Sequence, residues 1–324
     1  MLRIGIIGVG HLGKIHLKLI KELPQFELVG FYDHDDENSE FAVRELGVKR
    51  FSSFQELADQ VDAIDIVTPA LSHFEYASKS LRMSKHVFIE KPITYSTKEA
   101  KTLVSLAEEA NVKVQIGHVE RFNPAFIAAL PFISHPMFIE TKRLANYNPR
   151  GMDVSVAVDV MIHDIDIILS LIKSPVKRVS SVGAAVIGKT ADMINARLEF
   201  ANGAVANLSA SRIAMKNVRE TVIFQNDSYI NIDFLNKTTQ IIRHKAAGSP
   251  MEGKAFAMEL ASGQDGNILQ FITPPIILSN AIKSELEQFA SAIENDTPTP
   301  VTIEAGYEAL NIANKINEIL RLRS

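Results

Sequence analysis

The chain has 324 residues, of which 46% are hydrophobic and 22% charged, so it is long enough to form two domains. Lys and Arg number 34 against 38 Asp and Glu, and a net charge of −4 leaves no basic excess to favour nucleic acid or an anionic membrane as a partner. The absence of cysteine excludes disulfides, thiolate nucleophiles and cysteine-based metal sites.

No apolar run approaches the roughly 20 residues that span a bilayer, and the first residues lack the layout of a signal peptide. We therefore expect a cytoplasmic protein with no nucleic-acid or membrane partner.

The first third of the sequence alternates short apolar runs with amphipathic stretches, the pattern of βαβ units around a parallel sheet. Strands buried on both faces are apolar nearly throughout, which predicts strands over residues 2–7, 27–32, 63–68, 86–89 and 112–116. Helical spacing predicts the intervening helices over 11–22, 36–46, 72–83 and 96–110. Ser96 and Glu99 have the spacing of a capping box at the start of the last helix.

After Gly117 several prolines interrupt this rhythm, so we expect one domain over residues 1–121 and a second over 122–324. Alternating runs predict strands over 137–144, 176–187, 193–200, 203–210, 219–225 and 229–234, with helices over 155–172, 278–294 and 303–321. Asn202-Gly203 has the form of a hairpin turn. The second domain is thus expected to be α/β with an open, largely antiparallel or mixed sheet, while residues 242–275 have no clear pattern.

A glycine-rich turn follows the first strand and opens the first helix: Gly8, Gly10 and Gly13, with His11 and Leu12 in between. The first glycine permits a tight turn, the second lets the backbone approach a pyrophosphate, and the third permits close helix-strand packing. The sequence therefore predicts a doubly wound, dinucleotide-binding Rossmann domain at the amino terminus.

Asp33 follows the second strand, 20 positions after Gly13, where a carboxylate can bond the hydroxyls of the adenosine ribose. Because this carboxylate repels a 2′-phosphate, we expect NAD as the cofactor rather than NADP. Thr68 and Pro69 end another strand at the carboxyl edge of the sheet, where they are expected to face the cofactor or simply to end the strand.

Two further features carry chemistry. Glu90-Lys91-Pro92 ends a buried strand, which places an ammonium group at the carboxyl edge unless Lys91 is only a solvated cation. Asp159 and His163 are four residues apart on one helix face, where a carboxylate can orient an imidazole that removes a hydroxyl proton. The alternative for His163 is a satisfied core or interface residue. Asp164 and Asp166 also raise the possibility of a metal site, which the dinucleotide fold disfavours, so no metal is expected.

Together these residues resemble the glucose-fructose oxidoreductase, inositol dehydrogenase and MocA family, in which a Rossmann domain with a Glu-Lys-Pro motif precedes an open-sheet α/β domain. The resemblance covers nearly the whole chain and includes the run from Arg121 to Pro124. It implies that Lys91, Asp159 and His163 are the catalytic group, with His163 as acid/base. It also implies that Thr68, His73 and Glu90 line the cofactor site beside Lys91.

Within the family, residues 117–124 and 143–163 are most similar to the sugar-nucleotide branch, the UDP-N-acetylglucosamine 3-dehydrogenases. The segment Val154–Val158 departs from the family's usual glycine-rich lead into the catalytic helix. The resemblance implies an NAD-dependent dehydrogenase of a secondary hydroxyl on a sugar or sugar nucleotide, acting as a homodimer or homotetramer. The alternatives are a reductase of a non-sugar substrate, such as a linear tetrapyrrole, and a non-catalytic NAD-binding sensor.

Cations in the second domain point to the same substrate. An Arg fork matches two phosphate oxygens, so basic residues near His163 predict binding of a diphosphate unless they are solvated surface cations. The expected substrate-binding residues are Arg121, Arg143, Arg150, Asp159 and His163, with Arg212, Lys216 and Arg219 in the same basic set.

Overall fold

The computed structural model describes residues 1–148, 154–187, 190–246, 254–259 and 267–321. The chain divides into two compact units. The first contains Met1–Val119 and Asn280–Asn311, and the second contains Glu120–Ser279 and Ile312–Ser324. The first unit is therefore discontinuous, whereas we had expected a single boundary after residue 121.

The first unit is built on a five-stranded parallel sheet in the order β2-β1-β3-β4-β5. Its strands are β1 (Leu2–Ile7), β2 (Phe26–Tyr32), β3 (Ala63–Ile66), β4 (His86–Glu90) and β5 (Val114–Gly117). The inner strands β3 and β4 are almost wholly buried, which explains why their sequences are apolar nearly throughout. A Rossmann-type doubly wound sheet is thereby confirmed.

Helices connect these strands, as expected. They are α1 (His11–Glu22), α2 (Asp36–Leu46), α3 (Phe54–Ala58), α4 (Ala70–Arg82) and α5 (Thr97–Ala110). The predicted capping box is present, since Ser96 and Glu99 each accept the other's backbone N–H. The short helix α3 was not predicted, because five residues are too few to show a helical period.

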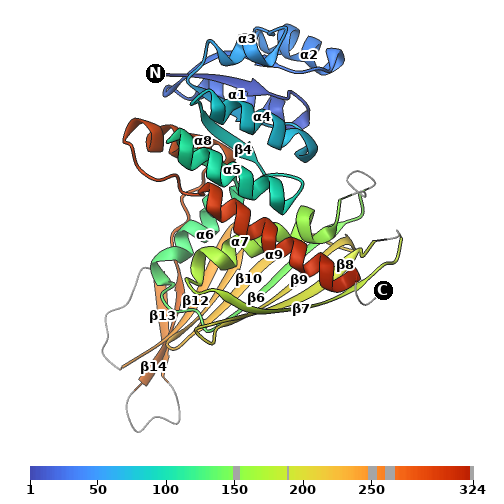
Figure 1. Ribbon diagram of the computed structural model, residues 1–324. Helices are drawn as coiled ribbons and strands as arrows, with labels where there is room; N and C mark the ends of the chain where they lie inside the picture. The colour runs from blue at the N-terminus through green and yellow to red at the C-terminus, as the bar shows by residue number, and fades with distance from the viewer. Residues whose placement is uncertain (149–153, 188–189, 247–253, 260–266, 322–324) are drawn as a thin grey trace. The chain divides into compact units, whose positions relative to one another are not determined.

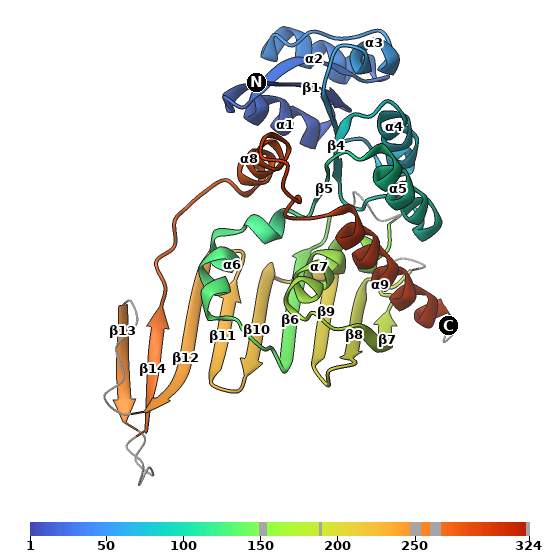
Figure 2. The ribbon, with the colours of Figure 1, turned by 60° about the vertical axis from the view of Figure 1, so that its left-hand side comes forward.

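A late helix completes the core of this unit. In α8 (Ala281–Glu294), Leu286 and Phe289 are fully buried in the same apolar cluster as Leu17 of α1 and Phe88 of β4. The side chain of Gln115 donates to the backbone carbonyl of Glu285 at 2.7 Å, which fastens α8 to β5. Figure 2 shows α8 beside α1, while α4 and α5 lie on the other side of the sheet. This packing places residues 280–311 in the first unit.

The second unit is a nine-stranded mixed sheet in the order β13-β14-β12-β11-β10-β6-β9-β8-β7. Among the strand pairs of the described residues, only β6–β9 is parallel, so the largely antiparallel or mixed sheet that we expected is confirmed. The strands are β6 (Phe138–Asn146), β7 (Val176–Ala184), β8 (Met193–Phe200), β9 (Val205–Ala214), β10 (Val218–Gln225), β11 (Ser228–Asp233), β12 (Thr238–Ala246), β13 (Lys254–Glu259) and β14 (Asn267–Thr273). Gly203, in the turn between β8 and β9, has φ +87°, as the Asn-Gly hairpin signal requires.

One face of this sheet carries the helices. Figures 1 and 2 show α6 (Pro124–Ala129) and α7 (Ile162–Leu171) on the same face, and no described helix of the unit lies on the other. Alternate residues of β8, such as Ile194 and Leu198, are buried under this layer. The last helix, α9 (Ile303–Arg321), contributes residues to both units. Among the described residues, we find no helix long and apolar enough to cross a membrane.

The predicted helix over 155–172 differs at its start. Residues Ala157–Met161 form a wider π-helical turn, which continues directly into α7. Single π turns inside helices occur frequently at functional sites. The turn therefore draws attention to Asp159, which it contains, and to His163, which follows it.

Candidate active site

The glycine turn after β1 has the geometry that the sequence predicts. Gly8 has φ +91°, and a Cβ atom at Gly13 would lie 2.1 Å from the carbonyl oxygen of Gly8. A side chain at either position would therefore be strained or would collide with the turn. A Cβ at Gly10, in contrast, would have no atom within 4 Å, so the backbone there is open to a ligand. His11 and Leu12 begin α1, whose N-cap residue Gly10 supplies no side-chain hydrogen bond.

Asp33 is held in one orientation at the end of β2. Its Oδ2 accepts the backbone N–H of Val9 at 2.6 Å, and its Oδ1 accepts the N–H of Asp35 at 2.9 Å. Two backbone amide donors fix the direction of the carboxylate. Asp33 is therefore a preorganised acceptor beside the glycine turn.

These residues line a pocket of about 270 Å³ at the carboxyl edge of the sheet. Of the predicted cofactor residues, the pocket contains Gly8, Gly10, Asp33, Thr68 and Pro69.

Sequence reasoning missed several residues of this pocket, among them Tyr32, Asn38, Ser72 and Tyr76. Burial is the main cause that raises the pKa of Tyr76 to about 12, so its hydroxyl keeps its proton further into the alkaline range than an ordinary tyrosine does. Tyr76 packs edge-on against Tyr32 with ring centroids 6.3 Å apart. The available signals were the end of a strand for Tyr32, and the i, i+4 spacing of Ser72 and Tyr76 on α4.

The lining of the pocket suits the phosphate and ribose groups of a dinucleotide. A turn open at Gly10, the start of a helix and an oriented carboxylate are the features that hold a pyrophosphate and a ribose diol in this fold. No part of this fit depends on the second unit, because all these residues belong to the first.

His73 and Glu90 lie behind the pocket. The ring nitrogens of His73 lie 2.8 Å from the carbonyl oxygens of Pro92 and Thr68, so the ring bridges the segments that follow β4 and β3. Burial lowers the pKa of His73, and a neutral ring donates a hydrogen bond to only one of these two carbonyls. Glu90 is 7% exposed and accepts the backbone N–H of Lys91 at 3.1 Å. We had expected both residues to line the cofactor site. They do not line the pocket beside Asp33, so their contact with the cofactor stays a prediction.

Lys91 is partly exposed at the carboxyl end of β4, as predicted. In the second unit, Asp159 is exposed within the π turn and His163 is partly exposed in the first turn of α7. The backbone N–H of Asp159 donates to the carbonyl of Ser155 at 2.9 Å, so the helical path already begins before the π turn. The structure thus presents all three side chains to solvent or ligand.

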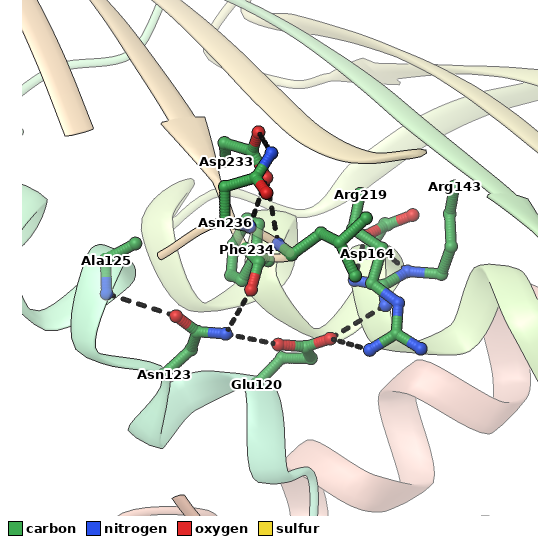
Figure 3. Close-up of polar contacts among 10 residues, drawn as sticks. Glu120, Asn123, Ala125, Arg143, Asp164, Arg219, Asp233, Phe234 and Asn236 are labelled. Atoms are coloured by element: carbon green, nitrogen blue, oxygen red, sulfur yellow. Dashed lines mark hydrogen bonds and ion pairs between the residues drawn. The ribbon is translucent and has the colours of Figure 1, made fainter. Parts of the chain in front are cut away.

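The two further aspartates of α7 have structural partners. Arg121 forms a two-point contact with Asp166, with bonds of 2.7 and 2.6 Å. Arg143 binds Asp164 through two nitrogens and Glu120 through a third at 2.8 Å (Figure 3). These pairs fasten α7 to the sheet and to the segment that begins the second unit, and they disfavour a metal site at Asp164 or Asp166.

Arg143 was predicted to bind substrate phosphate, but its guanidinium is 6% exposed and already neutralised. Burial alone lowers the pKa of Arg143, but the charges of Asp164 and Glu120 outweigh burial and raise that pKa above its ordinary value. Glu120 also bonds Asn123, whose amide reaches the carbonyl of Phe234 (Figure 3). Arg143 is therefore part of a buried ion-pair network.

The remaining basic residues differ in exposure and pairing. Arg212 pairs with Asp192 at 3.1 Å and bonds the carbonyl of Val154. Arg219 remains half exposed, 3.7 Å from Glu120. Arg150 lies outside the described residues. Only part of the predicted set is thus available to a phosphate.

Comparison with known proteins agrees with this geometry. The description "Oxidoreductase family, NAD-binding Rossmann fold" matches residues 2–118, and "GFO/IDH/MocA C-terminal domain" matches residues 133–229. The chain belongs to the GFO/IDH/MocA oxidoreductase family. The family resemblance inferred from the sequence is thereby confirmed.

One relative is the UDP-N-acetylglucosamine 3-dehydrogenase of Acidithiobacillus ferrooxidans. It is 39% identical to this chain, and the match covers 97% of this chain and 96% of the relative. A solved structure of that dehydrogenase superimposes with a TM-score of 0.89 at 33% identity, covering 99% of this chain and 98% of the other. The scyllo-inositol 2-dehydrogenase (NAD(+)) of Bacillus subtilis is 29% identical, covering 65% of this chain and 67% of the relative.

Proposed function

We propose that this oxidoreductase is an NAD-dependent dehydrogenase that oxidises a secondary hydroxyl of a sugar nucleotide, of the UDP-N-acetylglucosamine 3-dehydrogenase type. The observation that carries the proposal is the 39% identity to such an enzyme over 97% of the chain. The pocket beside Asp33 supports the cofactor assignment, and the exposure of Lys91, Asp159 and His163 supports their catalytic role.

In this mechanism each residue has one task. His163 accepts the hydroxyl proton as the C–H bond breaks, and Asp159 orients the imidazole or stabilises its charged form. Lys91 holds the substrate oxygen and stabilises negative charge on it. NAD held beside Gly8, Gly10 and Asp33 would supply the hydride acceptor.

Asp33 should determine the choice of cofactor. We expect the protein to bind NAD more tightly than NADP, and Asp33→Ala to narrow the NAD/NADP affinity ratio by about tenfold or more, because a hydrogen bond to a charged group contributes about 1.5–3 kcal/mol. Calorimetry with both cofactors measures the ratio. Glu37→Ala, which removes an exposed carboxylate from the neighbouring helix α2, is the control and should leave the ratio unchanged. Tighter binding of NADP by the unmodified protein would contradict the assignment.

The substrate is tested by turnover. Purified protein with NAD should reduce the cofactor, seen as nicotinamide absorbance, when UDP-N-acetylglucosamine is added, and UDP alone should compete. Turnover of an uncharged sugar without competition by UDP would reject a sugar nucleotide but keep a dehydrogenase. Turnover only in the reductive direction with a non-sugar substrate would favour the reductase alternative. Binding of NAD without any turnover would favour a sensor.

The helix-free face of the second unit supports a homo-oligomer, which we propose to be a dimer or tetramer. An apolar row crosses six neighbouring strands, with ring centroids 6.1 and 5.2 Å apart at one end and 4.8 Å at the other. The row consists of Phe138, Phe224, Tyr229, Ile242, Phe271 and Phe256. Phe224 and Phe256 are 44% and 65% exposed. A continuous exposed apolar patch is typical of a protein interface, and light scattering of the purified protein measures the assembly mass.

A further inference from the structure

A cluster of ionisable side chains lies buried in the first unit, between the sheet and helices α1 and α8. His16 of α1 contacts Asp65 of β3 at 2.8 Å through Nδ1 and Glu90 of β4 at 3.3 Å through Nε2. Glu285 of α8 is fully buried, and one atom each of His16, Glu90 and Glu285 lie within 4.8 Å of one another. Gln115 of β5 completes the cluster through its bond to the backbone of Glu285.

The surroundings of the cluster are apolar. Phe88 packs edge-on against His16 with centroids 5.8 Å apart, and Phe289 packs against Phe88 at 5.9 Å. Within the described residues, both carboxyl oxygens of Glu285 lie buried without a hydrogen-bond donor. An ionised carboxylate in such a place is very unfavourable, because no hydrogen-bond donor of the described residues offsets its lost solvation.

A charge count identifies the group that must be neutral. Burial alone lowers the pKa of His16, but the charges of Asp65 and Glu90 outweigh burial and raise that pKa well above its ordinary value, so His16 is cationic. His16 balances one of the carboxylates around it, and burial also raises the pKa of Asp65, its partner at Nδ1. Ionised Glu285 would add a negative charge that has no hydrogen-bond donor among the described residues. Burial first, and the charge of Glu90 second, raise the pKa of Glu285 well above its ordinary value.

We propose that Glu285 is a neutral carboxylic acid at physiological pH, hydrogen-bonded through its proton toward Glu90, and that it acts through Glu90 as a positioning residue for Lys91. The proton supplies the donor that the buried oxygens otherwise lack. Glu90 accepts the backbone N–H of Lys91 at 3.1 Å, so a fixed Glu90 carboxylate holds the start of the segment that carries the ammonium group. A Cβ at Gly117 would lie 2.8 Å from Glu90 Oε1, so the glycine leaves room for the carboxylate.

Unfolding experiments on the whole chain test the proton directly. Between the ordinary pKa of Glu285 and its raised native pKa, the unfolded chain has released the proton and the native chain keeps it, so rising pH favours unfolding. Glu285→Gln has no proton to release. The ratio of unfolding constants, wild type over Glu285→Gln, should therefore increase about tenfold per pH unit between about pH 5 and 7. Glu287→Gln, two residues along the same helix, is the control. The ratio of unfolding constants, wild type over Glu287→Gln, should not change with pH in this way. A flat or opposite slope for Glu285→Gln would overturn the proposal.

Infrared spectroscopy and metal analysis test the protonation state of Glu285 in a second way. The wild-type protein at neutral pH should show the C=O stretch of a protonated carboxylic acid, and Glu285→Gln should lose it while Glu287→Gln keeps it. A stoichiometric divalent cation in the purified protein, lost together with stability on chelation, would mean that Glu285 is an ionised ligand and would overturn the proposal. Both measurements are independent of any enzymatic activity.

The positioning role rests on the proposed dehydrogenase function and needs kinetics. Glu285→Leu, which has no hydrogen-bonding group to offer Glu90, should lower kcat by about tenfold with an unchanged dissociation constant for NAD, because small displacements of a reacting group are costly. Glu285→Gln should restore kcat, since a neutral amide still donates to Glu90. Equal losses in both variants, or none in Glu285→Leu, would overturn the positioning role. If no substrate is turned over, the proposed function fails, and the unfolding and infrared results still decide the protonation state.

Discussion

His163→Ala and Lys91→Ala are each expected to lower kcat by about 10²–10⁴-fold, the usual contribution of a positioned acid or base, while the NAD dissociation constant stays unchanged. Both side chains are proposed to act on the substrate hydroxyl. The cofactor pocket is formed instead by residues near Gly8, Asp33 and Thr68, and neither Lys91 nor His163 lines it. Nicotinamide absorbance measures turnover, and calorimetry measures cofactor affinity.

Two exposed residues provide matched controls: Lys98→Ala on α5 and His135→Ala before β6 remove the same side-chain types and should leave kcat unchanged. Near-normal turnover of His163→Ala would show that another group or water removes the proton. A large loss of NAD affinity in Lys91→Ala would assign that lysine mainly to cofactor binding.

Arg143→Met should destabilise the protein by about 3–5 kcal/mol, because it leaves the buried carboxylates of Glu120 and Asp164 without their cation. Urea unfolding, followed by circular dichroism, measures the loss. Arg219→Met is the matched control: its guanidinium is half exposed and 3.7 Å from Glu120, so the expected loss is below about 1 kcal/mol.

This experiment separates the two interpretations of Arg143. A structural ion pair predicts a lower free energy of unfolding, with UDP affinity following only the folded fraction. If Arg143→Met were as stable as the wild type but bound UDP more weakly, the guanidinium would bind the phosphate that the sequence pattern first indicated.

The amino-terminal sheet could be read from the sequence because its strands are buried on both faces and therefore apolar without interruption. β1 begins and ends where predicted, and the other strands shift by only one or two residues. The glycine turn could be predicted equally well. Gly8 has a positive φ and Gly13 has no room for a Cβ atom, and only glycine suits both positions. Features that depend on neighbouring residues, such as a buried strand or a tight turn, can therefore be predicted from the sequence.

Long-range pairing leaves no such pattern. Arg143 meets Glu120 and Asp164 across 23 and 21 positions, and a cation at that spacing looks the same whether it binds a carboxylate or a phosphate. β14 was missed because it buries the polar side chain of Gln270 between those of Ile268 and Ile272, which interrupts the apolar pattern of the strand. Glu285 drew no attention because nothing in its helix shows which groups it will face.

Helix α8 is synthesised long after the five strands whose core it covers, and this order affects folding on the ribosome. Once Val119 has been made, the five parallel strands are complete, but the helix that brings Leu286 and Phe289 to their core lies more than 160 residues further along. At about 5–20 residues per second, translation to Asn311 takes roughly 10–40 s more, during which Leu17 and Phe88 lack part of their cover. In a fragment that ends near residue 120, Leu17 and Phe88 would permanently lack the cover that α8 provides. Expression of the dinucleotide-binding unit by itself therefore requires residues 280–311 to be joined back onto it.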